Sequence, residues 1–131
     1  MAAPLLIDTD VLVDYLRGRT EAAAYLEART EPLLISVITV AELFAGVREG
    51  EERRLLEQFL SAFEIVVLTR EIAREGGLYR RDYGPSHGVG LADALIAATA
   101  GLRQARLVTL NARHFPMLTV EVPYQKVQAE I

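Results

Sequence analysis

The stretch from Leu5 to Leu16 constrains the fold more than any other part of the sequence. Its apolar run Leu5-Leu6-Ile7 leads directly into Asp8, and apolar residues return at helical spacing after Thr9-Asp10. This pattern predicts a short buried strand, a tight turn and an amphipathic helix. Because ligands bind beyond the carboxyl ends of strands in open α/β sheets, Asp8 is a candidate site residue. Taken alone, Asp8 is equally well explained as a turn or helix-capping residue.

Length and composition limit the class of protein. The 131 residues predict one domain, spanning 1–131, that is long enough to bury a core. No apolar run approaches the roughly 20 residues that span a bilayer, and no basic segment precedes the first apolar run as in a signal peptide. The absence of cysteine excludes disulfides and thiolate metal sites, and it fits a cytoplasmic protein. The net charge of −4 has the wrong sign for binding nucleic acid through bulk charge alone.

Expected strands and helices alternate along the chain. The strands are expected at 5–7, 33–36, 65–68, 106–110 and, weakly, 118–122, and the helices at 11–17, 20–29, 38–47, 51–63, 70–83 and 91–102. Turn residues predict a loop over 84–90, and 111–115 is expected to form a short turn or helix. The alternation predicts an α/β fold with a central, mostly parallel sheet of four to five strands flanked by helices.

Two further carboxylates stand among apolar residues. Glu42 interrupts the apolar segment 37–47, which predicts a helix buried almost all round, and buried acids are normally paired or bound to metal. A narrow exposed stripe on that helix is the other explanation. Asp93 falls in the first turn of the 91–102 helix, where the helix dipole favours a carboxylate with or without a catalytic role.

Asp8, Glu42 and Asp93 each lie next to, or follow, the carboxyl end of an expected strand, so we expect them to converge. Crowded carboxylates repel one another, and a cation between them relieves that repulsion. Oxygen ligands without histidine or cysteine select Mg²⁺ or Mn²⁺ over zinc. A carboxylate-held ion with an open face is suited to phosphodiester hydrolysis.

Segments in four parts of the chain carry a family resemblance. They are Leu6-Ile7-Asp8-Thr9-Asp10-Val11-Leu12, residues 36–43, residues 91–100 and Leu107-Val108-Thr109-Leu110-Asn111-Ala112-Arg113-His114-Phe115. In this order they resemble the motifs of PIN-domain ribonucleases, most closely the VapC-type toxins of toxin–antitoxin pairs. The resemblance implies a PIN fold, Mg²⁺- or Mn²⁺-dependent endoribonuclease activity, commonly on structured RNA such as tRNA, and a homodimer. It also implies a cognate antitoxin that inserts a segment into the acidic groove, for which the helices between Val11 and Arg29 are our candidates.

The resemblance also implies roles for single residues. The catalytic and metal-binding residues are Asp8, Glu42 and Asp93, and the supporting residues are Thr9, Thr109 and Asn111. Asn111 stands where the family usually has a fourth acid, which favours one tightly held ion over two. Asp10 either compensates for the missing acid or caps the first helix. A metal-bound water oriented by Asp8 and Asp93 is expected to attack the phosphorus and leave a 5′-phosphate.

Basic and histidine residues outside these motifs have two interpretations. Arg80, Arg81 and His87 form either a basic lip for the RNA backbone or an ordinary solvated helix end. His114, beside Phe115, is interpreted as a packing or capping residue and not as a catalytic one.

Alternative functions remain open at this stage. Asp8-Thr9-Asp10-Val11 also resembles the first motif of haloacid-dehalogenase-type phosphatases, with Asp8 as nucleophile and Asp10 as general acid. That chemistry calls for a later lysine and another acidic pair, whereas the only lysine is Lys126, with only Glu130 after it. The chain does not fit a receiver domain for a similar reason, because it has no lysine at the end of an expected strand. A catalytically weak PIN-like module that binds metal or RNA without cutting is the other alternative, suggested by Asn111.

Overall fold

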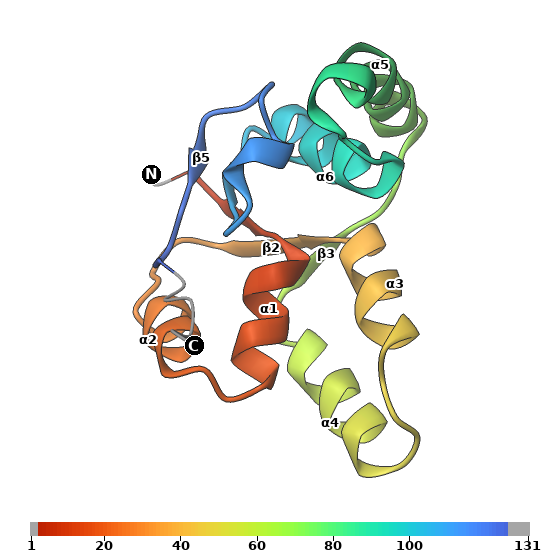
Figure 1. Cartoon of the computed structure of the whole chain (residues 1–131). Coiled ribbons are helices and arrows are strands. Elements are labelled where there is room, and N and C mark those ends of the chain that lie inside the picture. Colours follow the sequence, from red (N-terminus) through yellow and green to blue (C-terminus); the bar gives the residue numbers. More distant parts are fainter. Residues whose placement is uncertain (1–2, 126–131) are drawn as a thin grey trace, which may run out of the picture.

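The structure, a computed structural model, describes residues 3–125. Along the chain (Figure 1) the elements are β1 (Leu5–Ile7), α1 (Thr9–Leu16), α2 (Thr20–Glu27), β2 (Leu33–Ser36), α3 (Val37–Ala45), α4 (Glu51–Leu60), β3 (Glu64–Val66), α5 (Arg70–His87), α6 (Leu91–Leu102), β4 (Arg106–Val108), the 3-10 helix η1 (Ala112–His114) and β5 (Val120–Glu121). Lys126, the lysine weighed in the comparison with phosphatases, lies outside the described residues.

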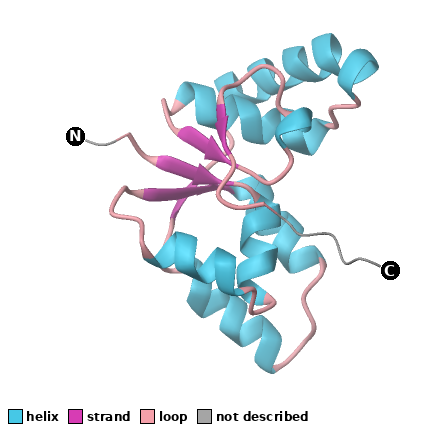
Figure 2. Ribbon diagram, turned by 60° about the vertical axis from the view of Figure 1, so that its left-hand side comes forward, coloured by secondary structure: helices cyan, strands magenta, loops and turns pink. Residues whose placement is uncertain are grey.

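The strands of the described part form one parallel sheet, drawn in magenta in Figure 2, in the order β3-β2-β1-β4-β5. β1 is the central strand, and its three side chains are at most 2% exposed. A continuous apolar run is the pattern of a parallel strand that is covered on both faces. The expected α/β fold with a parallel central sheet is therefore confirmed.

Helices cover both faces of the sheet, with α5 and α6 on one side and α1, α3 and α4 on the other (Figure 1). Alternate residues of β1 serve the two sides, because successive side chains of a strand point in opposite directions. Leu5 and Ile7 belong to the apolar cluster that includes Leu12 and Leu43, whereas Leu6 belongs to the cluster built around Ile96. The carboxyl end of β1 is thus fixed from both sides.

The end of α5 departs most from the expected elements. The expected loop over 84–90 is wrong, because α5 continues through Gly84 and Pro85 and ends at His87. Pro85 lies in the last turn, so its missing N–H costs the helix a single hydrogen bond. Gly88 then adopts the left-handed conformation with a φ of 65°, and its N–H donates to the Gly84 carbonyl at 2.9 Å.

Other boundaries shift by a few residues. β4 ends at Val108 instead of continuing to Leu110, and the weak last strand is reduced to Val120–Glu121. Because β4 ends early, the residues after Val108 are free to turn over the carboxyl end of β1. Within the described residues, no helix combines the length and the apolar character needed to cross a membrane.

Candidate functional site

Asp8 directly follows β1, and only 5% of the residue is exposed. Its Oδ1 accepts a hydrogen bond from the Thr9 N–H at 2.8 Å, and its Oδ2 accepts one from the Thr109 hydroxyl at 2.7 Å. Burial, and after it the negative charge of Asp10, raises the pKa of Asp8 to about 7, although both hydrogen bonds lower it. Asp8 therefore caps α1 and also carries a charge that the surrounding protein stabilises poorly.

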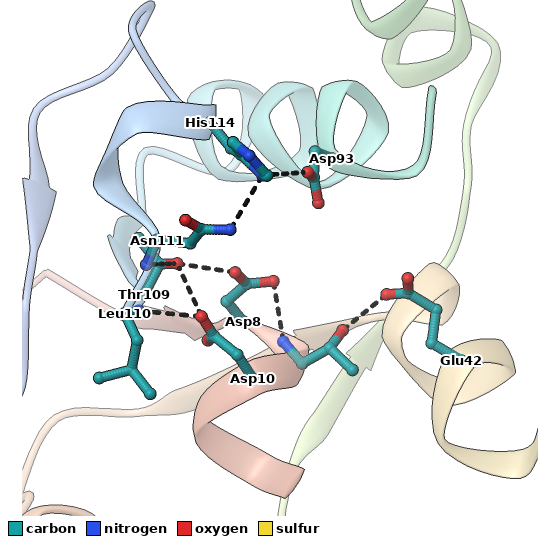
Figure 3. Close-up of polar contacts among 9 residues, drawn as sticks. Asp8, Asp10, Glu42, Asp93, Thr109, Leu110, Asn111 and His114 are labelled. Carbon is teal, nitrogen blue, oxygen red and sulfur yellow. Dashed lines mark hydrogen bonds and ion pairs between the residues drawn. The ribbon is translucent and has the colours of Figure 1, made fainter. Parts of the chain in front are cut away.

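The turn after β4 closes over Asp8 (Figure 3). Thr109 is fully buried, and its hydroxyl oxygen accepts a hydrogen bond from the Asn111 N–H at 3.0 Å while its proton goes to Asp8. Asp10 accepts a hydrogen bond from the Leu110 N–H at 3.1 Å. Asp10 therefore binds this turn, and the expectation that it caps α1 is wrong.

Asp93 lies in the first turn of α6, with 29% of its side chain exposed. Its Oδ2 is 3.2 Å from His114 Nδ1, and the same ring nitrogen is 2.9 Å from Asn111 Nδ2. The packing or capping interpretation of His114 does not include this contact, and its exclusion from catalysis stays a prediction. Nothing in the spacing of a single sequence points to this contact, because it joins side chains that are 21 positions apart.

Glu42 lies on α3 and is exposed, so the expectation of a buried carboxylate is wrong. The helix turns only part of its surface inward, through Thr39 and Leu43, and leaves Ala41 and Ala45 open. The Glu42 carboxylate accepts a hydrogen bond from the Thr9 hydroxyl at 2.7 Å. The apolar composition of α3 misleads here because alanine is compatible with an exposed face as well as with a core.

The carboxylates of Asp8, Glu42 and Asp93 come from three elements and lie around the carboxyl end of β1 (Figure 3). Within residues 3–125, no three acidic or histidine side chains stand close enough to bind one metal ion together. Sharing an ion therefore requires side chains to rotate, and the exposed Glu42 has the most freedom to do so. The donor set fits Mg²⁺ or Mn²⁺, since all of its ligand atoms are carboxylate oxygens and a cation would relieve the repulsion felt by Asp8.

The basic residues near the end of α5 already have neighbours within the protein. The Arg81 Nε is 2.8 Å from Asp82, and the His87 Nδ1 is 2.7 Å from the Ser86 hydroxyl. The Arg80 guanidinium occupies the space that a Cβ at Gly84 would need. That these residues contact RNA stays a prediction.

Comparisons with known proteins agree with this architecture. The PIN domain family matches residues 5–117. Ribonuclease VapC10 of Mycobacterium tuberculosis is 46% identical over 116 residues, which cover 86% of each chain. Ribonuclease VapC19 of the same species is 45% identical over 124 residues, covering 91% of this chain and 98% of the relative.

A solved structure shows the same arrangement of elements. It is described as a toxin–antitoxin complex from Klebsiella pneumoniae, with a TM-score of 0.82 and 32% identity over 93% of this chain and 99% of that one. The residues that match the PIN domain family, 5–117, include β1 to β4 and the carboxylates of Asp8, Glu42 and Asp93. The chain therefore belongs to the PIN-domain family, among its VapC-type ribonucleases.

Proposed function

We propose that the chain is an endoribonuclease whose Asp8, Glu42 and Asp93 hold Mg²⁺ or Mn²⁺, and that it acts in the cytoplasm as the toxin of a toxin–antitoxin pair. Two similar proteins are named ribonucleases, which supports RNA as the substrate. The observation that carries the proposal is the buried carboxylate of Asp8, whose pKa is raised by burial and by the charges of Asp10 and Asp93. A buried acid in such surroundings favours a bound cation.

The residues around Asp8 prepare it for this role. Hydrogen bonds from Thr9 and Thr109 fix both of its oxygens, so that little reorganisation is needed when an ion arrives. The Thr9 hydroxyl also orients Glu42, which links α3 to the end of β1. Asn111 brings no charge, so we expect one tightly held ion. Held by Asp8, Glu42 and Asp93, such an ion would activate water and neutralise charge on the phosphodiester, and we expect the cleaved RNA to carry a 5′-phosphate.

The test is cleavage of a labelled tRNA panel by the purified protein. We expect cleavage with Mg²⁺ or Mn²⁺ and none with EDTA. The cleavage rate of Asp8→Asn should be lower than that of the wild type by roughly 100-fold or more, since a group that stabilises the transition state is removed. Glu71→Gln is the matched control, because Glu71 is an exposed acid in the first turn of α5. RNA binding without cleavage would favour the module suggested by Asn111, and turnover of a small phosphomonoester would revive the phosphatase alternative.

The proposed antitoxin site is a groove of about 540 Å³ between α1, α3 and α4. Its apolar lining includes the exposed Leu16 and Leu55, and the charged residues Arg17, Arg48 and Glu52 add charges of both signs at the same place. Of the helices between Val11 and Arg29, α1 lines this groove and α2 does not. Glu42 also lines it, so a segment bound there would contact the proposed metal site.

Two measurements test the proposed partners. We expect Leu16→Arg to prevent a co-expressed antitoxin from co-purifying with the chain, because a charge then enters the apolar lining. Retained co-purification would place the antitoxin elsewhere on the surface. Light scattering is expected to give twice the 14.5 kDa mass of the chain for the proposed homodimer, and a mass of one chain would contradict it.

A further inference from the structure

The turn between β4 and β5 contacts the two carboxylates on opposite sides of the site. The Thr109 hydroxyl donates to Asp8 at 2.7 Å, and His114 Nδ1 lies 3.2 Å from Asp93 Oδ2 (Figure 3). We propose that His114 is a positioning residue, which orients the Asp93 carboxylate relative to Asp8 while Asn111 fixes its ring. This inference rests on the proposed function, because it concerns how the metal-binding carboxylates are held.

The position of His114 is fixed by its neighbours in the turn. Phe115, which is 1% exposed, anchors the turn in the same apolar cluster as Ile96 of α6, the helix that carries Asp93. The His114 N–H donates to the Asn111 carbonyl at 3.0 Å, and the Asn111 N–H donates to Thr109 at 3.0 Å. An unbroken chain of contacts therefore runs from Asp8 through the turn to Asp93.

The chemistry of the ring nitrogen decides how these groups bond. His114 Nδ1 has Asp93 Oδ2 at 3.2 Å and the Asn111 amide at 2.9 Å, and a single nitrogen cannot donate to one and accept from the other. In the proposed arrangement Nδ1 carries the proton and donates it to Asp93, because a carboxylate only accepts. The Asn111 amide then turns its oxygen toward the ring, since a half-turn exchanges its two polar atoms.

This arrangement gives Asn111 a role that a fourth acid would not fill. A carboxylate at position 111 would compete with Asp93 for the Nδ1 proton, because a charged acceptor binds a donor more strongly than an amide does. The neutral amide supports the ring and leaves the stronger bond to Asp93. Asn111 therefore acts on the site through His114 and Asp93, without having to bind the ion itself.

The inference is tested by two substitutions of His114 whose side chains place an amide nitrogen at different positions. Asparagine puts its amide nitrogen near the position of Nδ1, whereas glutamine puts it near Nε2. We expect His114→Gln and His114→Ala to weaken Mn²⁺ binding in titration calorimetry by roughly 10- to 100-fold, the usual effect of losing a group that orients a metal ligand. His114→Asn should stay within about twofold of the wild type if the donor at Nδ1 is what matters.

A second measurement separates positioning from folding. In an Asp93→Asn background, His114→Gln should cause no further loss of Mn²⁺ affinity, because His114 acts through the Asp93 carboxylate. Unfolding temperatures in EDTA identify any variant that fails to fold, and metal affinities are compared only among folded variants. Equal affinities in the wild type and His114→Gln, or an equal loss in the Asn and Gln variants, would overturn the inference. A wild-type protein that binds no Mn²⁺ would instead overturn the proposed function, and this inference with it.

Discussion

Replacing Asp8 by asparagine should stabilise the metal-free protein while it removes a proposed metal ligand. Burial and the charge of Asp10 raise the pKa of Asp8 from 3.8 to about 7. A carboxyl group with a raised pKa adds stability below its unfolded value, and that stability is lost as the pH rises through its folded value. The penalty in wild-type protein is therefore small in acid and complete above neutral pH, whereas an asparagine at this position has no such dependence.

The size of the effect follows from the two pKa values. At 1.36 kcal/mol per pKa unit, the raised pKa of Asp8 costs the folded protein roughly 4.3 kcal/mol at pH 8 and about 1.7 kcal/mol at pH 5. We therefore expect the free energy of unfolding of Asp8→Asn, relative to wild type, to increase by about 2.5 kcal/mol between pH 5 and pH 8. Urea denaturation in EDTA at the two pH values measures this difference.

A control variant and a measurement with Mn²⁺ complete this test. Asp82→Asn removes the same charge from an exposed position and should show no comparable widening with pH. Mn²⁺ at pH 8 should stabilise the wild type and not Asp8→Asn, because only the wild type keeps the ligand. A stability difference that stays constant between pH 5 and pH 8 would refute the raised pKa and, with it, the reasoning that a cation belongs beside Asp8.

Two further substitutions test the packing that holds the site. Thr109→Val should lower the free energy of unfolding, measured in urea, by about 1–3 kcal/mol, because Asp8 loses its buried hydrogen-bond donor. Thr109→Ser keeps the hydroxyl and should recover most of the lost stability. Equal stability of the wild type and both variants would contradict the role of this hydrogen bond. Gly76→Ala should cost about 1–3 kcal/mol by forcing α5 away from α6, because its Cβ would lie 2.6 Å from Leu95 Cδ2 and 3.1 Å from Leu95 Cα. Gly77→Ala, which has open space, is its control and should be neutral or slightly stabilising; a similar loss in both variants would show that helix backbone effects dominate.

The sequence by itself determined the class of fold and the central carboxylate. The apolar run of β1 followed immediately by Asp8 required a strand covered on both faces, with an acid at its carboxyl edge. Thr109 was also named from the sequence, through the family resemblance, whereas only the structure shows that β4 ends at Val108 and leaves Thr109 just beyond it. The central strand and its acid depend on local patterns, which a chain displays before it folds.

Only the tertiary structure decided which side chains meet and which are exposed. Glu42 belongs to an apolar segment, yet it is exposed, because the sheet and its neighbours cover only one side of α3. The contact of His114 with Asp93 exists because Phe115 anchors η1 in the core beside α6, and no periodicity encodes that distance. Likewise, α5 continues through Gly84 and Pro85 although both residues predict a loop. Contacts between distant parts of a chain follow from packing, and packing overrides the local preferences that a sequence displays.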